Sequence, residues 1–450
     1  MHREHDLLSG SIAGTLARLA LPNLFAVLSL LLYHLTDTFF ISRLGTQPLA
    51  ALSLTFPVTL VVSSVALGLG AAMSAQLGRL LGEGDRAQGR QFVSHGLLLT
   101  MVVVGVFAFG GALTIDPLFR LLGADEALIG LVHDYMLIWY LGVGLLVLPM
   151  VGNQALRATG NTFTPALVTA VAALVNAILD PLLIFGIGPF PRLEMQGAAI
   201  ATVISWMLTF VVALYMLTGR HRLLARINPA RLRDHWRRML HIARPATLSN
   251  LLNPVANGVL IALLARMDTD AVAAFGAGTR IESLLLILVT ALCGALTPFI
   301  AQNLGAGQQV RAAKALMGSI HVVLLAQLGI YLLLWPLAPQ LAALFSTDPN
   351  VVHYLTLYLR WVPAAYGTLG VVILLAMSLN AYHRPMSALM LNLARLALLL
   401  LPGAWLGSQW LGVEGVFIAI PLANLAMGGA CYLLARQVAE PATLPQQQRA

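Results

Sequence analysis

The stretch Pro22-Asn-Leu-Phe-Ala-Val-Leu-Ser-Leu-Leu-Leu-Tyr-His-Leu-Thr-Asp-Thr-Phe-Phe-Ile41 decides the fold of this 450-residue chain. A continuous apolar run of about 20 residues crosses a bilayer as a helix, yet this one contains a carboxylate, Asp37. A second carboxylate, Asp180, lies in the fifth such run, four residues after Asn176. Ionisable groups at membrane depth are costly and are functional by default. We therefore predict that Asp37 and Asp180 form the ion or proton site of a transporter.

Composition places most of the chain in a bilayer. Hydrophobic residues make up 59% and charged residues 10% of the sequence, and the mean hydropathy is +0.83. The apolar runs are continuous, whereas barrel strands alternate over about ten residues. We therefore predict an all-α integral membrane protein with twelve transmembrane helices. The predicted helices cover residues 16–41, 48–78, 92–114, 131–156, 163–188, 196–218, 241–265, 271–302, 312–336, 351–380, 385–406 and 412–435.

Basic residues are distributed unevenly over the predicted loops. Of the 26 lysines and arginines, 19 fall on one side of the membrane, four in loops on the other side and three inside helices. The positive-inside rule then predicts a multi-pass protein of the inner membrane with both termini cytoplasmic. The basic cluster at 220–238 lies between two spanning helices, so we expect it to anchor membrane lipids rather than to bind nucleic acid.

The helices offer no cluster of catalytic or metal-ligating residues. Cys293 and Cys431 both lie inside predicted apolar helices, and neither His-x-x-x-His nor an acid-rich motif occurs in them. We therefore expect no disulfide, no structural metal and no organic cofactor. We also expect that the protein is not an enzyme.

The two halves of the chain repeat one another. A single ungapped shift of 223 residues superimposes rare residues and one turn motif over about 110 positions. The shift pairs Pro22 with Pro245, Arg43 with Arg266, Leu81-Gly-x-Gly84 with Leu304-Gly-x-Gly307, Asp125 with Asp348, and Tyr135 with Tyr358. The chain is thus predicted to be duplicated.

The repeat predicts the domain organisation. Six crossings per half give both halves the same orientation, so they relate by a pseudo-two-fold axis along the membrane normal. Such parallel repeats are an architecture of alternating-access carriers, whose site lies near the bilayer midplane. We predict two pseudo-symmetric six-helix lobes, at 1–218 and 240–450, joined by a basic cytoplasmic linker at 219–239.

Four motifs lie at fixed places in the predicted helices. They are Pro22…Tyr33-x-x-x-Asp37, Ala75-Gln-x-x-Gly78…Gly82-x-Gly84, Gln154-Ala-Leu-Arg-Ala-Thr-Gly160 and Asn176-x-x-x-Asp180-Pro181. Together they resemble the multidrug and toxic compound extrusion (MATE) transporters, and within this family the DinF-like branch. The resemblance covers essentially the whole chain.

The resemblance implies a V-shaped pair of lobes that opens alternately to each side and exports cationic or amphipathic organic compounds in exchange for H+ or Na+. In this branch the first lobe carries the coupling site. The matching positions here are Tyr33, Asp37, Tyr135, Asn153, Asn176, Asp180 and Thr202. The NorM-like branch instead uses acids in the second lobe, and the corresponding stretches Leu252–Gly258 and Leu375–Asn380 contain none.

Spacing supports the same site independently. Tyr33 and Asp37, like Asn176 and Asp180, are four residues apart, so each pair forms a polar stripe on one helix face. Two carboxylates brought together out of water do not both ionise cheaply. We expect the pair to hold a proton, or a transient Na+ bound by Asp37, Asn176 and Asp180.

Pro22 adds a mechanical element to the first helix. A proline inside a helix removes one backbone hydrogen bond and favours a kink. Our hypothesis is that occupancy at Asp37 switches this helix between straighter and bent shapes and thereby alters the substrate cavity.

Several of these residues also have a purely structural interpretation. In it, Asp37 is a polar residue near a helix end, and Asp180, which precedes Pro181, caps a broken helix. Tyr135 and Asn153 then supply hydrogen bonds between helices. These alternatives stay open at the level of sequence.

Further polar residues lie next to the site or in the second lobe. His34 is turned about 100° around the helix from Tyr33, so we expect it to pack rather than to relay protons. Arg280 and Glu282 form a polar pocket, with Arg395 as a counter-ion. We expect these three to pair with one another and to set lobe packing; contact with substrate is the alternative.

Two rival transport functions are weighed against the exporter. A flippase for a lipid-linked precursor would need a strongly cationic central cavity, and the first lobe has almost no arginine in its interior. A passive channel does not require two duplicated halves, which favour a rocking carrier. We therefore predict a monomeric antiporter for small organic compounds.

Overall fold

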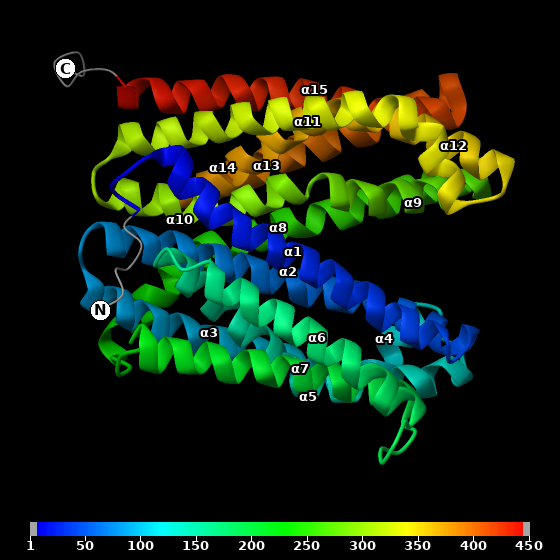
Figure 1. Ribbon diagram of the computed structural model, residues 1–450, viewed down its shortest axis with the longest axis horizontal. Coiled ribbons are helices and arrows are strands. Elements are labelled where there is room, and N and C mark those ends of the chain that lie inside the picture. The colour runs from blue at the N-terminus through cyan, green and yellow to red at the C-terminus, as the bar shows by residue number, and fades with distance from the viewer. Residues whose placement is uncertain (1–6, 444–450) are drawn as a thin grey trace. The chain divides into compact units, whose positions relative to one another are not determined.

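Helices account for almost all of the described chain, residues 7–443, in the computed structural model (Figure 1). No strand occurs among these residues, so the predicted all-α fold is confirmed. The chain divides into two compact units, one holding Leu19–Ala243 and the other holding Leu7–Arg18 together with the chain from Arg244 on. Both predicted cytoplasmic termini, at residues 1–6 and 444–450, lie outside the described residues.

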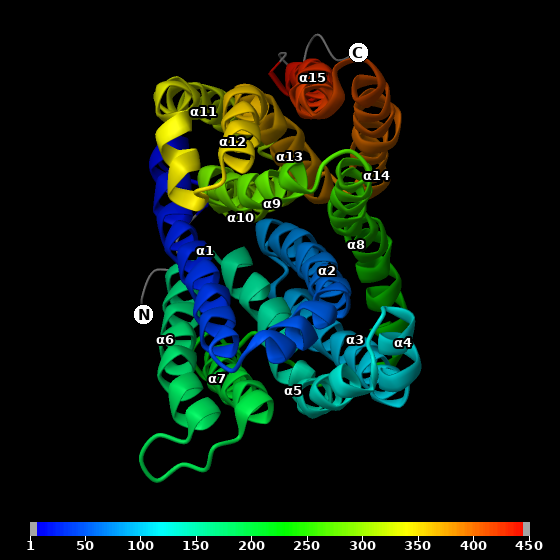
Figure 2. The ribbon, with the colours of Figure 1, turned by 90° about the vertical axis from the view of Figure 1, so that its right-hand side faces the viewer.

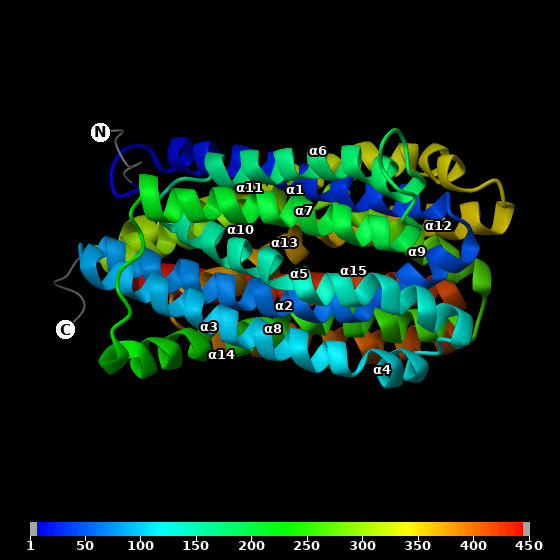
Figure 3. The ribbon, with the colours of Figure 1, turned by 90° about the horizontal axis from the view of Figure 1, so that it is seen from below.

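The first unit is a bundle in which α5 is central. Its helices are α1 (Ile12–Ser42) from Leu19 on, α2 (Thr46–Gly82), α3 (Arg86–Leu113), α4 (Ile115–Leu121), α5 (Glu126–Ala158), α6 (Phe163–Phe185), α7 (Glu194–Tyr215) with the π-helical turn η1 (Met216–Arg220), and the start of α8 (Pro229–Ala265). Helix α5 packs against α2, α3 and α7, and α6 packs against α7 (Figure 3).

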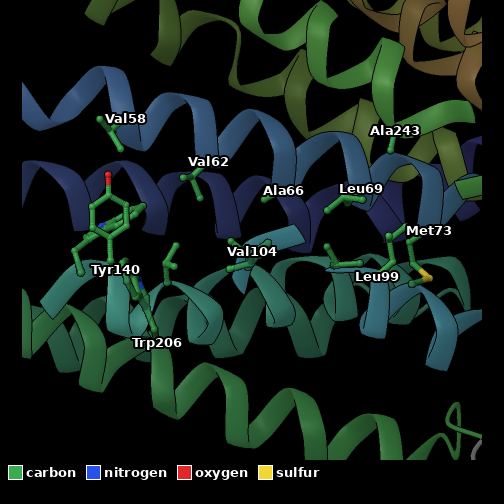
Figure 4. Packing of buried hydrophobic residues seen from close by; sticks show 14 of the residues in the cluster. Val58, Val62, Ala66, Leu69, Met73, Leu99, Val104, Tyr140, Trp206 and Ala243 are labelled. Atoms are coloured by element: carbon green, nitrogen blue, oxygen red, sulfur yellow. The ribbon is translucent and has the colours of Figure 1, made fainter. Parts of the chain in front are cut away.

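One face of α2 supplies much of the core of this unit. Figure 4 shows Val58, Val62, Ala66, Leu69 and Met73 on that face. Their spacing of three or four residues forms an apolar stripe on a helix, and the stripe meets buried side chains of α3, α5 and α7. Burial therefore orients α2 about its axis.

The second unit is a separate bundle of long helices. They are α8 from Arg244 on, α9 (Thr269–Leu285), α10 (Ile287–Gly305), α11 (Gln309–Phe345), α12 (Pro349–Trp361) with the 3-10 turn η2 (Val362–Ala365), α13 (Tyr366–Ala381), α14 (Pro385–Leu393), the π-helical segment η3 (Ala394–Leu400) and α15 (Leu401–Thr443). Figure 2 shows the helices of each unit nearly end-on.

The membrane-spanning segments match the predicted ones with two differences. Eleven helices of the described chain are long and apolar enough to cross a bilayer. The span Pro385–Val438 contains two predicted crossings, which Gly412 separates with the left-handed values φ 62° and ψ −140°. The predicted crossing at 271–302 consists of α9 and α10, which are divided at Leu286. All twelve predicted crossings are thus helical.

Repeat-related residues adopt the same local structure in both units. Asp125 caps α5 by accepting from the Leu128 backbone N–H at 2.9 Å, and Asp348 caps α12 by accepting from the Asn350 N–H at 2.8 Å. The equivalent turn glycines also agree, since Gly84 has φ 80° and Gly307 has φ 73°, a region that glycine adopts without strain. These agreements support the duplication.

The chain passes between the units inside two helices. It does so in α1 between Arg18 and Leu19 and in α8 between Ala243 and Arg244. Each point at which the chain passes from one unit to the other lies within four residues of one of the repeat-related prolines, Pro22 and Pro245.

Residues Leu7–Arg18 pack with the second unit, whereas the sequence predicted them as part of the first lobe, 1–218. The carbonyl of Leu7 accepts from Asn303 Nδ2 at 3.2 Å. Arg311 donates to the carbonyls of Ser9 and Gly10, each at 2.8 Å. These bonds join residues about 300 positions apart, so sequence spacing gave no sign of them.

The basic linker is partly helical and is attached to α3. The segment His221–Asn228 has no regular secondary structure, and α8 begins at Pro229, inside the predicted linker at 219–239. The Asn228 backbone N–H donates to His95 Nε2 at 3.0 Å, and His95 Nδ1 lies 2.9 Å from His235 Nδ1. The linker is therefore held to α3 by buried His95, by Ser94 Oγ, which accepts from the Ala225 N–H at 2.9 Å, and by Arg90, which donates to the Leu224 carbonyl at 3.2 Å.

Candidate functional site

Asp37 of α1 and Asp180 of α6 come together in the first unit. Asp37 is 8% exposed and Asp180 is fully buried, and the two carboxyl groups interact electrostatically. Asn176, one helical turn before Asp180, donates from Nδ2 to Asp180 Oδ1 at 3.1 Å. The structure thus brings Asp37 of α1 close to Asp180 and Asn176, the two residues that spacing placed on one face of α6.

Three further predicted residues join this cluster from α1, α5 and α7. Tyr33 and Tyr135 lie within electrostatic range of both acids. The Tyr33 hydroxyl lies beside Thr202 and Trp206 of α7, although none of its contacts reaches hydrogen-bond geometry. Four helices therefore contribute polar side chains to one buried place.

Sequence reasoning did not select Trp206. Its indole packs edge-to-face on Trp139 of α5 with the ring centroids 5.8 Å apart, and it is 9% exposed. It follows Thr202 by four residues, the spacing that places two side chains on one helix face. That spacing was the available signal.

The cluster holds an unusual number of oxygen atoms without partners. Buried polar atoms almost always have hydrogen-bond partners, and each unpartnered one costs about 1–3 kcal/mol. The unpartnered buried oxygens of the cluster are Tyr33 Oη, Asp37 Oδ1, Asn176 Oδ1, Asp180 Oδ2 and Thr202 Oγ1. The cluster is therefore chemically suited to a small cation or to protons, which would bond these oxygens.

The cluster lies toward one end of the spanning helices. Asp37 and Asp180 are each five residues before the end of their helices, and Thr202 is eight residues after the start of α7. At 1.5 Å per residue these positions are about 8–12 Å from the helix ends. The general carrier pattern predicted a site near the middle of the membrane. In the structure the cluster lies instead toward one end of α1 and α6.

Asn153 and Pro22 lie apart from the cluster. Asn153 is 18 residues beyond Tyr135 on α5, or about 27 Å along the helix axis. Pro22 lies 15 residues before Asp37, inside α1, which continues as a helix through it. His34 is exposed, with its ring edge-to-face on Tyr33 at 5.4 Å between centroids.

An apolar pocket of about 250 Å³ lies elsewhere in the first unit, between α3, α5 and α7. Its wall is made almost entirely of carbon side chains. The lining residues are Leu97, Leu98, Met101, Leu148, Pro149, Phe210, Ala213, Leu214 and Leu217. None belongs to the acidic cluster, so this pocket contributes no charge or hydrogen bond to ion coupling.

The expected mutual pairing of Arg280, Glu282 and Arg395 does not form. Arg280 is exposed. Glu282 accepts from the hydroxyls of Tyr358 at 2.9 Å and Tyr366 at 3.2 Å. Both phenols bond the same carboxylate oxygen, Oε2. Arg395 lies within electrostatic range of Glu282 but bonds amide oxygens instead.

Known proteins resemble this chain over nearly its whole length. An FAD transporter of Shewanella oneidensis is 54% identical over 443 residues, which cover 98% of each chain. The multidrug export protein MepA of Staphylococcus aureus is 25% identical and covers 92% of this chain and 91% of its own.

Solved structures agree with the fold. The Vibrio cholerae MATE transporter VcmN in its bent form has a TM-score of 0.90 and 31% identity, covering 96% of this chain and 98% of its own. The MatE family model matches residues 22–182 and 245–406, so its two segments begin at the repeat-related prolines. The chain therefore belongs to the MATE family of multi-pass membrane transporters.

Proposed function

We propose that this protein is an exporter that exchanges H+ or Na+ for an organic cargo, with the coupling ion bound between Asp37 and Asp180. The observation that carries the proposal is the group of five buried, unpartnered oxygens from three helices around these acids. A proton on one carboxyl group, or a Na+ among the oxygens, supplies the missing bonds. Its departure leaves two acids that repel each other.

We propose FAD as a cargo of this exporter. The support is the relative described as an FAD transporter, whose 54% identity extends over 98% of both chains. Cationic and amphipathic compounds are the second candidate, supported by the multidrug export relatives at 25% identity. Between the two, the higher identity favours the flavin dinucleotide.

The orientation completes the proposal. In the described chain, the exposed arginines at the start of α8 are Arg231, Arg233, Arg237 and Arg238, next to the irregular segment at 221–228. The positive-inside rule places this linker in the cytoplasm. The acidic cluster lies near the opposite ends of α1 and α6, hence nearer the outer face of a bacterial inner membrane.

Transport into oriented proteoliposomes tests cargo and coupling together. Vesicles with the cytoplasmic face outward receive external FAD, with H+ or Na+ loaded inside in separate experiments. We expect FAD to accumulate only when one of these ion gradients is present. Accumulation that is independent of both gradients contradicts the coupling, and gradient-driven transport of a cationic dye without any FAD transport contradicts the cargo.

Matched variants locate the site. Asp37→Asn and Asp180→Asn keep side-chain volume but remove the titrating group, so both are expected to abolish gradient-driven uptake. Asp134→Asn is the control, because Asp134 is exposed on α5 and accepts from Gln196 Nε2 at 3.0 Å outside the cluster. Equal loss in all three variants contradicts the assignment of the site.

A further inference from the structure

A buried guanidinium without a salt bridge lies in the second unit, with Glu282 within electrostatic range but bonded by two phenols. Arg395 is 5% exposed and belongs to η3, inside the span Pro385–Val438. Among the described residues no salt bridge within 4.0 Å includes it. A charge in a membrane-spanning segment is expensive and marks a functional group by default. Arg395 therefore needs an explanation beyond packing.

The partners of Arg395 are neutral oxygens. One Nη atom donates to Asn424 Oδ1 at 2.9 Å and the other to Asn253 Oδ1 at 2.5 Å. The Nε–H is buried without a partner. A guanidinium offers five N–H groups in a planar fork that fits two oxygens of a phosphate, and bonds to anionic oxygens are stronger than bonds to amides. The two amide oxygens occupy positions suited to an anion.

A polar strip leads from the surface of this unit to Arg395. Asn253 is exposed and is the outer member of the pair. One helical turn earlier, Asn392 Nδ2 donates to Ser249 Oγ at 2.6 Å, joining α14 to α8. Ser249 and Asn253 share a face of α8 by their spacing of four residues. An anion that displaces the Asn253 amide thus reaches the guanidinium along polar groups.

The backbone is irregular at the same place. Pro254 follows Asn253 inside α8 and leaves one backbone carbonyl without its helical donor. Arg395 lies in the π-helical segment η3. Such segments are frequent at functional sites. One helix beside Arg395 is therefore π-helical there, and another lacks one backbone hydrogen bond.

The three helices around Arg395 are repeat-related to three helices of the acidic cluster, although the residues are not at equivalent positions, because the shift of 223 pairs Asp37 with Leu260 and Asp180 with Gly403. In the first unit α1, α6 and α7 supply Asp37, Asp180 and Thr202. The equivalent first, fifth and sixth helices of the second unit are α8, α14 with η3, and α15. They supply Asn253, Arg395 and Asn424. The same three helices thus carry acids in one unit and a base in the other.

We propose that Arg395, with Asn253 and Asn424, forms the site that binds the pyrophosphate of the exported flavin dinucleotide. The inference rests on the proposed cargo. Its chemistry is the bidentate bonding of two phosphate oxygens by the guanidinium, with the two amides turning their N–H2 groups toward the same anion. The isoalloxazine and adenine rings need no charge from this site.

Quenching of flavin fluorescence on the purified full-length protein tests the site. FAD, FMN and riboflavin differ in phosphate number, so the wild type is expected to bind FAD most tightly and riboflavin most weakly. In Arg395→Gln the affinity for FAD is expected to fall by at least about tenfold, the loss of hydrogen bonds to a charged group, while riboflavin binding stays unchanged. Arg395→Lys keeps the charge and recovers part of the affinity.

A second variant of the site and one control keep the result interpretable. Asn253→Asp places a carboxylate beside Arg395 at an exposed position, so it is expected to lower FAD affinity without disturbing the fold. Arg360→Gln removes a spanning arginine whose guanidinium lies 5.7 Å from the Trp335 ring centroid, and it leaves FAD binding intact.

The outcomes separate the two claims. If the wild type binds none of the flavins, the proposed cargo and this site both fail. If the wild type binds FAD and Arg395→Gln binds it equally well, the site alone is overturned. A lipid-linked precursor also carries a pyrophosphate. A polyprenyl pyrophosphate in mixed micelles is therefore used as a competitor of FAD. If the polyprenyl pyrophosphate displaces bound FAD at a lower concentration than added free FAD does, the dinucleotide assignment is overturned.

Discussion

Asn176 Nδ2 donates to Asp180 Oδ1 at 3.1 Å, one turn apart on α6. The amide can donate to this oxygen whether the carboxyl group is ionised or protonated at its other oxygen. Asp180 Oδ2 has no partner, so it is the atom that remains for a proton or a cation. The hydrogen bond thus fixes the acid and leaves its reactive oxygen unbonded.

Removal of this amide is expected to weaken ion coupling. Asn176→Leu keeps the branched shape but removes the donor and one oxygen, so the Na+ concentration for half-maximal transport is expected to rise by about tenfold or more, as for bonds to charged groups. For H+ the sign is opposite, because a carboxylate that loses a hydrogen-bond donor takes up a proton more readily. Transport at several Na+ concentrations and pH values measures it. Thr169→Val is the control, because Thr169 bonds only the Pro165 carbonyl of the same helix. A similar rise in both variants argues against a role for the amide.

The acids and most of their neighbours were predictable from sequence, whereas Trp206 and the position of Asn153 were missed. A carboxylate inside an apolar run is visible without a structure, because the bilayer makes it costly. The contact of Trp206 with Tyr33 depends on how α1 and α7 pack, and an apolar sequence leaves their rotation open. The separation of Asn153 from Tyr135 follows from their spacing of 18 residues on α5, but the family resemblance had grouped the two residues in one site.

Pro22→Ala is expected to slow transport without weakening ion binding. The proline lies next to the point where α1 passes between the units, and alanine restores the backbone hydrogen bond that favours a straight helix. Turnover should fall several-fold at saturating ion. Pro57→Ala, in α2 of the same unit, is the control with unchanged turnover. Normal turnover in Pro22→Ala contradicts a bending role.

The His95–His235 contact is expected to make the linker sensitive to pH. Because the Asn228 N–H donates to His95 Nε2, neutral His95 carries its proton on Nδ1 and donates it to His235 Nδ1. Protonation of either ring puts a hydrogen where an acceptor is needed. The contact is therefore present at high pH and lost as pH falls. The charged groups nearest His235 are Asp234, Arg231 and Arg238.

A spin label at Arg226→Cys, on the exposed linker, measures this loss. The label is expected to become more mobile only as the pH falls below about 6.5, the ordinary pKa of histidine, because burial lowers the pKa of His235. In His95→Gln the label should be mobile at every pH. In the control His241→Gln, at an exposed residue of α8, the label should keep its pH response. A label that stays immobile at low pH rules out the switch.

Gly415→Ala is expected to destabilise the second unit. A Cβ at Gly415 would meet the backbone carbonyl of Gly407, and a Cβ at Gly407 would meet that of Gly415. Neither backbone can move aside as a side chain does, so a loss of about 1–3 kcal/mol is expected. The thermal unfolding midpoint in detergent measures it, with Gly429→Ala as control, because that site is open. Equal midpoints would show that the two segments do not pack this closely.

The second unit shows why charge pairing is hard to predict. Sequence suggested that Arg395 pairs with Glu282, since both lie in apolar spans. In the structure the hydroxyls of Tyr358 and Tyr366 both donate to Glu282 Oε2. Arg395 donates to the amide oxygens of Asn253 and Asn424. Several buried polar residues compete as partners, and only packing selects among them. The duplication itself was predictable, because its caps and turns are local.

The most direct test of the central claim counts ions and FAD together. Oriented proteoliposomes are monitored for FAD uptake while a pH probe and radioactive sodium record ion efflux. The prediction is a fixed number of H+ or Na+ leaving per FAD in the wild type and in Asp134→Asn, with both fluxes lost in Asp37→Asn and Asp180→Asn. Ion efflux that stays coupled to FAD uptake in either of the last two variants would contradict coupling at these acids.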